Sequence, residues 1–213
     1  MAVRKSIYTI PSTVTANARS YLQRLADLTQ SALVTDREGA AISLDEGAER
    51  AVRLILAAGA GSGKVMAVGN GGSATIASHM QNDLCKAVGV PGMVFTEPAL
   101  LMALANDDGY ETVFESPIEL WARPGDVLVA ISSSGRSENV LRGVRAATLR
   151  ECHIITFTGF DEDNPLRRMG DINFYVASQV YGFVENAHAA ITHFITDRAM
   201  SITKEQAQAE VGA

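Results

Sequence analysis

The chain has 213 residues, of which 47% are hydrophobic and 20% charged, and this suits one soluble α/β domain with a full core. A formal net charge of −6 without long Lys/Arg runs argues against nucleic-acid binding, and no apolar segment approaches the roughly 20 residues that cross a bilayer. The two cysteines, Cys85 and Cys152, form neither a disulfide framework nor a metal-ligand spacing, and no signal-peptide pattern is found, so we predict a cytoplasmic protein.

Two amphipathic helices are predicted before the first strand. Residues 13–33 carry apolar side chains at helical spacing, and residues 44–58 do so again. The second helix begins with Asp45 and Glu46, and acidic residues favour a helix N-terminus. Packing against a sheet and building an oligomer explain these helices equally well.

The rest of the chain alternates strands with helices. The strand at 126–132 is almost wholly apolar, which is typical of a strand buried on both faces. The alternation predicts a doubly wound parallel sheet flanked by helices in one α/β domain, with the N-terminal helices as an extension. The predicted strands are 64–68, 93–96, 126–132, 153–157 and 172–176, and the predicted helices are 73–86, 98–105, 137–149 and 184 to about 208.

Two of these strands end in small, polar residues that open a helix. Small residues let backbone N–H groups approach a ligand, and the helix turns its positive end toward the same place. Hydroxyl groups add donors without fixed charge, which suits a phosphate that binds and leaves. Because both loops follow strand carboxyl ends, they predict a phosphorylated small molecule at the edge of the sheet. The residues are Asn70, Gly71, Gly72, Ser73, Ser132, Ser133, Ser134 and Ser137.

Two nucleotide-binding patterns are present only in part. Residues 59–64 look like part of a P-loop, but Ser or Thr is missing after Lys64, and the segment precedes the strand that it should follow. Residues 69–74 fit a loose dinucleotide pattern, with Glu97 near the place of a ribose-binding acid. That pattern leaves the serine-rich loop unexplained, so a nicotinamide enzyme is the least favoured interpretation.

Three of the four histidines lie on two helices that also carry carboxylates. His79 and Asp83 are four residues apart, so they share one helix face, and Glu185, His188 and His193 lie on the last helix. Such residues can chelate a divalent metal or act as acid and base, while a surface hydrogen bond or a core histidine is the alternative. For His188 we favour the core. Glu185 and His193 are about 12 Å apart along a straight helix, which strains joint binding of one ion.

In this order the motifs resemble those of sugar-isomerase (SIS) domain proteins, and most closely the phosphoheptose isomerases. The similarity runs from about residue 44 to 200. It implies a single SIS domain over residues 1–213, with helices at about 13–58 and a sugar-phosphate-binding core with a five-stranded sheet at about 64–208. It also implies a cytoplasmic homotetramer with shared active sites. The motifs are Gly69-Asn-Gly-Gly-Ser73, His79-x-x-x-Asp83, Ala105-Asn-Asp107, Ile131-Ser-Ser-Ser-Gly-Arg-Ser137 and Glu185-x-x-His188-x-x-x-x-His193.

The resemblance implies a role for each matching residue. Asp83 and His193 match the acid/base pair, and both also belong to the four zinc positions His79, Asp83, Glu185 and His193. Two residues depart from the family, which has glutamate at Asp83 and glutamine at Glu185, and Ala87 stands where the family has a basic residue. The implied substrate contacts are Asn70, Gly71, Gly72, Ser73, Asp83, Asn106, Asp107, Ser132, Ser133, Ser134, Ser137 and Glu185.

The implied reaction is the aldose–ketose isomerisation of sedoheptulose 7-phosphate to D-glycero-D-manno-heptose 7-phosphate through an enediol. One alternative is a non-catalytic SIS protein of the DnaA-initiator-associating type. That type lacks the metal-site carboxylate and the second histidine that Asp83 and His193 supply here, so we favour the enzyme. The other alternative is an isomerase of a different sugar phosphate, which the changes at Asp83 and Glu185 favour.

Overall fold

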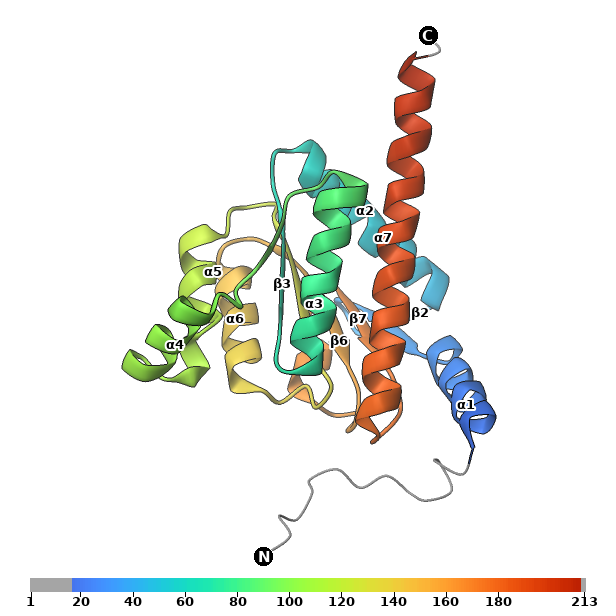
Figure 1. Ribbon diagram of the computed structural model, residues 1–213, viewed down its shortest axis with the longest axis horizontal. Helices are drawn as coiled ribbons and strands as arrows, with labels where there is room; N and C mark the ends of the chain where they lie inside the picture. Colours follow the sequence, from blue (N-terminus) through green and yellow to red (C-terminus); the bar gives the residue numbers. More distant parts are fainter. Residues whose placement is uncertain (1–16, 212–213) are drawn as a thin grey trace, which may run out of the picture.

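The computed structural model describes residues 17–211 and forms three layers, with helices on both faces of a central sheet (Figure 1). The sheet has seven strands in the order β2-β1-β7-β6-β5-β3-β4. Strands β4, β3, β5, β6 and β7 are mutually parallel. The strands are β1 (Leu33–Asp36), β2 (Ala41–Ile42), β3 (Val65–Gly69), β4 (Gly92–Val94), β5 (Val127–Ser132), β6 (His153–Thr158) and β7 (Ile172–Tyr175).

One face of the sheet is covered by α2, α3 and α7, with α1 packed beside α7, and the other face by α5 and α6 (Figure 1). Within residues 17–211 no helix has both the length and the apolar character that crossing a membrane requires. The helices are α1 (Ala18–Gln30), α2 (Leu44–Ala60), α3 (Gly72–Asp83), α4 (Pro98–Asp107), α5 (Glu115–Trp121), α6 (Glu138–Leu149) and α7 (Tyr181–Val211), with short helical turns at Leu84–Val88 (η1), Tyr110–Thr112 (η2) and Pro165–Arg168 (η3).

Strand β5 lies at the centre of the core, as its apolar sequence predicts. All six of its residues are buried. Successive side chains of a strand point to opposite faces, so Val129 and Ile131 pack under α2, α3 and α7, while Leu128 and Ala130 pack under α5 and α6. Burial on both faces explains why the strand has no polar alternation.

The prediction of a five-stranded, wholly parallel sheet is wrong at one edge. The five predicted strands are present as β3 to β7, but β1 and β2 form an antiparallel hairpin, and β1 pairs antiparallel with β7. Helix α1 ends at Gln30 rather than at residue 33, and the chain then enters β1. These strands are four and two residues long, too short to show a period of two. Residues 13–16 of the first predicted helix lie outside the described residues.

The chain direction changes between β3 and β5, which are neighbours in the sheet. From β3 the chain crosses to the outer strand β4, and from β5 it crosses the other way to β6 and β7. The helices that follow β3 and β5, α3 and α6, cover opposite faces, so the two loops diverge at the carboxyl edge. In parallel α/β sheets this is where ligands bind.

Candidate active site

A cavity of about 210 Å³ lies where β3 and β5 end, and we call it the serine cavity. The loop after β3, the loop after β5 and the first turns of α7 form its walls. The structure therefore brings together all eight residues that the two loops contributed to the prediction. The lining residues are Asn70, Gly71, Gly72, Ser73, Ser132, Ser133, Ser134, Ser137, Tyr181 and Glu185.

Two glycines are required by the shape of the first loop. Gly71 has a φ of +55° and a ψ of −121°, a conformation that residues with a Cβ rarely adopt. A Cβ on Gly72 would lie 2.5 Å from the carboxylate of Glu185. The glycines therefore bring the backbone at the start of α3 close to α7.

The serine cavity offers hydrogen-bond donors without a cationic side chain among its lining residues. The Ser133 hydroxyl is buried and has no partner within the described part of the chain, so it has capacity for a ligand oxygen. The N-termini of α3 and α6 both open on the cavity, where their partial positive charge favours an anion. Arg136 lies in the second loop but pairs with Asp163 at 2.9 Å.

The predicted acid/base pair and His79, another predicted metal ligand, meet between α3 and α7, which run side by side (Figure 1). The Asp83 carboxylate lies 3.6 Å from Nε2 of His79 and 3.4 Å from Nδ1 of His193. One ligand atom from each of these three residues lies within 4.8 Å of the others. They line a second cavity of about 210 Å³, with Thr192 among the other lining residues. We call this group the His–Asp–His cluster.

Glu185 does not lie with the His–Asp–His cluster. Its carboxylate faces Gly72 in the serine cavity. Glu185 lies in the second turn of α7, about two turns before His193, and this separation along the helix agrees with the expected strain on joint binding. Burial raises the pKa of the Glu185 carboxyl above its usual range. The structure therefore groups three of the four predicted metal ligands and leaves the fourth in the neighbouring cavity.

Asn106 and Asp107 are not brought into either cavity within one chain. They form the last turn of α4, where both are exposed and the Asn106 amide donates to the Asp107 carboxylate at 2.7 Å. Their contact with sugar hydroxyls stays a prediction.

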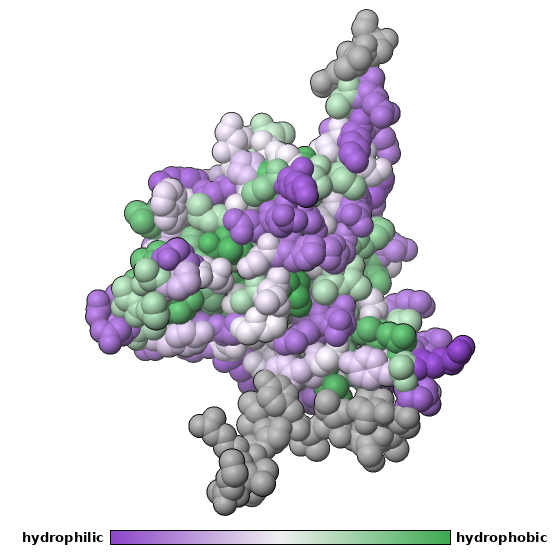
Figure 2. Space-filling model, in the orientation of Figure 1, coloured by the Kyte–Doolittle hydropathy of each residue, from purple (hydrophilic) through white to green (hydrophobic). Residues whose placement is uncertain are grey.

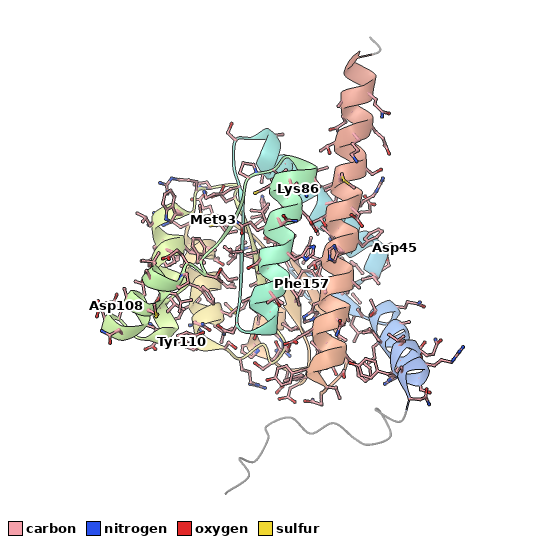
Figure 3. All side chains as sticks on the ribbon, viewed as in Figure 1. Asp45, Lys86, Met93, Asp108, Tyr110 and Phe157 are labelled. Atoms are coloured by element: carbon pink, nitrogen blue, oxygen red, sulfur yellow. The ribbon has the colours of Figure 1, made fainter. Side chains whose placement is uncertain are left out.

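His188 is a core histidine, as its sequence context favoured. Its side chain is fully buried, and its Nε2 lies 3.0 Å from the Thr158 carbonyl oxygen. Its ring packs in a T-shaped arrangement with Phe157 (labelled in Figure 3), with the ring centroids 5.6 Å apart. Burial lowers the pKa of the imidazole to about 4, so it is neutral near pH 7.

Three residues around the serine cavity were missed by sequence reasoning. Tyr181 lines the cavity, and Tyr110 and Asn139 hydrogen-bond to Asn70. Asn139 follows Ser137 by two residues, so the sequence could have predicted that it lies close to the second loop. Its contact with Asn70, 69 residues away, depends on how the strands pair and could not be predicted from the sequence.

This fold, with a serine-lined cavity at the carboxyl ends of its parallel strands, has the architecture of a SIS domain, and residues 21–159 match the family model of that name, "SIS domain". The phosphoheptose isomerase of Shewanella denitrificans is 32% identical over 184 residues, which cover 83% of this chain and 93% of that protein. A phosphoheptose isomerase of Shewanella oneidensis matches with the same identity and coverage. The chain belongs to the phosphoheptose isomerase family of SIS-domain proteins.

Solved structures agree with this assignment. The structure of a phosphoheptose isomerase from Neisseria gonorrhoeae superposes with a TM-score of 0.74 at 29% identity, covering 90% of this chain and 99% of that chain. A phosphoheptose isomerase from Francisella tularensis has the same fold, with a TM-score of 0.74 at 24% identity.

Proposed function

We propose that the protein is an aldose–ketose isomerase that converts sedoheptulose 7-phosphate to D-glycero-D-manno-heptose 7-phosphate. The observation that carries the proposal is the placement of one carboxylate between two imidazoles, next to a cavity built for an anion. Both sites are lined by α3 and α7. One phosphorylated sugar therefore spans from the serine cavity to the His–Asp–His cluster.

The serine cavity binds the phosphate group. Hydroxyl and backbone N–H donors hold it without a cationic side chain, so the product can leave. The phosphate is far from the reacting carbons, and its binding energy positions C1 and C2 at the cluster. Catalysis then requires proton donors and acceptors that face these two carbons.

Asp83 and His193 move the protons. Asp83 takes the proton from C1 of the ketose and returns it to C2, while His193 donates a proton to O2 and accepts the one that O1 releases. The enediol is the intermediate, and the reaction transfers no net proton. The 3.4 Å separation of the two groups supports this assignment, because two groups so close together can act on one pair of adjacent carbons.

We propose that zinc binds at the His–Asp–His cluster. Two imidazoles and one carboxylate with an open position are the ligand set of many catalytic zinc sites, and ligand atoms within 4.8 Å of one another fit one ion. His79, Asp83 and His193 would hold the ion. Glu185, the fourth ligand that the family resemblance implies, faces the serine cavity, so we assign it to the sugar. A bound ion polarises sugar oxygens and stabilises developing negative charge.

We also propose that the chain assembles as a homotetramer. Helix α4 is mostly apolar yet has no buried residue, and Leu100 and Met102 are 48% and 62% exposed. Hydrophobic surface gathers over this part of the molecule (Figure 2). Apolar surface of this kind marks an interface. Static light scattering of the purified protein should give four times the chain mass, and a monomer would contradict the proposal.

The purified protein is expected to interconvert sedoheptulose 7-phosphate and the heptose 7-phosphate, and to lose this activity when a chelator removes its metal. Elemental analysis should find about one zinc ion per chain before treatment, and added zinc should restore activity. Turnover can be followed by resolving the two sugar phosphates chromatographically, because the isomers have equal mass.

A panel of pentose, hexose and heptose phosphates separates this proposal from its alternatives. Turnover of another sugar phosphate in preference to the heptose phosphate would contradict the proposed substrate but not the isomerase activity. Absence of zinc together with absence of turnover on the whole panel would refute the enzyme and favour a binding protein.

A further inference from the structure

We propose that Asn139 and Tyr110 are positioning residues that hold the Asn70 amide as a hydrogen-bond donor directed at the ligand of the serine cavity. The identity of that ligand, a sugar phosphate, rests on the proposed function. The orientation of Asn70 rests on contacts within the chain alone.

The amide groups of Asn70 and Asn139 hydrogen-bond to each other twice. Nδ2 of Asn70 donates to Oδ1 of Asn139 at 2.9 Å, and Nδ2 of Asn139 donates to Oδ1 of Asn70 at 2.9 Å. Asn139 lies in the first turn of α6 and is 3% exposed. A buried amide with a reciprocal partner loses hydrogen bonds whenever either side chain rotates.

A backbone N–H group determines which atom of the Asn139 amide is the oxygen. The Val140 N–H donates to Oδ1 of Asn139 at 3.0 Å, and a backbone N–H is always a donor. Oδ1 of Asn139 must therefore be the oxygen, because exchanging O and N would put two donors together. This orientation of Asn139 in turn places the Asn70 oxygen toward Nδ2 of Asn139.

Tyr110 occupies the remaining acceptor position of Asn70. Its hydroxyl donates to Oδ1 of Asn70 at 3.0 Å. An amide oxygen accepts two hydrogen bonds and an amide nitrogen donates two. Both acceptor positions of Asn70 are now filled and one donor is used by Asn139. Within residues 17–211 a single N–H of the Asn70 side-chain amide is left without an acceptor, and Asn70 lines the serine cavity.

The network also joins three separate segments at the carboxyl edge of the sheet. Asn70 follows β3, Asn139 begins α6 after β5, and Tyr110 lies in η2, between α4 and α5. Figure 3 shows Tyr110 at the lower edge of the molecule, the edge where Figure 1 shows β3 turning into α3. The polar groups of the cavity wall are thereby arranged before a ligand arrives, which lowers the cost of ordering them on binding.

The first test uses crystals without ligand. In Asn139→Ala the Asn70 side chain is expected to leave its position or to occupy more than one rotamer, because two of its three hydrogen bonds are lost. An Asn70 side chain unchanged in that variant would overturn the proposal. Tyr110→Phe gives the same test of a single contact, and Tyr110 is 51% exposed, so this variant is expected to fold.

The second test measures binding of sedoheptulose 7-phosphate by calorimetry, with kcat and KM alongside. Tyr110→Phe and Asn139→Ala are each expected to weaken binding about 2- to 10-fold and to raise KM more than they lower kcat. If both act through Asn70, they should add little further loss in an Asn70→Ala background, whereas additive losses would overturn the proposal. Thr112→Val is the matched control, because Thr112 lies in the same short helix, donates its hydrogen bond to the carbonyl of Gly109 and makes none to Asn70.

The two tests separate this proposal from the proposed function. Wild-type protein that fails to bind sedoheptulose 7-phosphate contradicts the proposed function, while the ligand-free crystals still decide whether Asn139 positions Asn70. Wild-type turnover together with unchanged KM and unchanged binding in both variants contradicts the positioning role alone.

Discussion

Replacing His193 with alanine is expected to lower the turnover of sedoheptulose 7-phosphate by about 10²- to 10⁴-fold, the range of a lost general acid–base group. The imidazole lies 3.4 Å from the Asp83 carboxylate and is the group proposed to exchange protons with the sugar oxygens. The serine cavity contains no atom of His193. Binding of the sugar phosphate, measured by calorimetry, should therefore stay detectable while kcat falls.

His153→Ala is the matched control for this variant. The two imidazoles are 50% and 46% exposed, and each lies near one aspartate, since His153 is 3.8 Å from Asp171. His153 begins β6, at the amino end of the strands, far from both cavities. Loss of turnover in both variants would indicate a general effect of removing a histidine. Near-normal turnover in His193→Ala would refute its assigned role.

The core of the fold could be predicted because most of its strands and helices have a recognisable pattern within one continuous stretch of sequence. Each parallel strand is a mainly apolar run bounded by polar or small residues, and a helix follows four of the five. The β1–β2 hairpin could not be predicted, because two and four residues carry no measurable period. Leu33 also continues the apolar spacing of α1, so the helix is predicted to end at the first residue of β1, three residues beyond its actual end at Gln30. Helix α5, with seven residues, was missed for a similar reason.

The candidate site likewise contains residues whose positions follow from local sequence and others whose positions depend on packing. Eight of the ten residues that line the serine cavity lie in two loops, and the strand order brings these two loops together. The pairing of His79 with Asp83 follows from helical spacing. The approach of His193 to them needed the packing of α7 on α3, which came from the family resemblance and not from periodicity. The same resemblance implied that Glu185 joins the cluster, whereas the helix rise argued for separation, and the structure agrees with the helix rise.

Asp126 stabilises the sheet at the edge opposite the site, where the parallel strands begin. Its side chain is 1% exposed and precedes β5. It accepts hydrogen bonds from the backbone N–H groups of Lys64 at 2.9 Å and Arg123 at 2.8 Å, and from the Lys64 ammonium group at 2.5 Å. Lys64 precedes β3, so a single carboxylate ties together the beginnings of the two strands that carry the serine cavity at their other ends.

Asp126→Ala is expected to lower the free energy of unfolding by about 3–5 kcal/mol, the usual cost of removing one partner from a buried ion pair. Two backbone N–H groups lose their acceptor and the largely buried Lys64 loses its counter-ion, so the loss is far larger than for a surface pair. Urea unfolding measures it, and Asp163→Ala is the control, because Asp163 is 78% exposed, pairs with Arg136 at 2.9 Å and should change stability by less than about 1 kcal/mol. Equal effects of the two substitutions would contradict the stabilising role of Asp126. Because Asp126 lies at the amino ends of the strands, the kcat of the folded Asp126→Ala protein should match that of the wild type, which separates a loss of stability from a loss of chemistry.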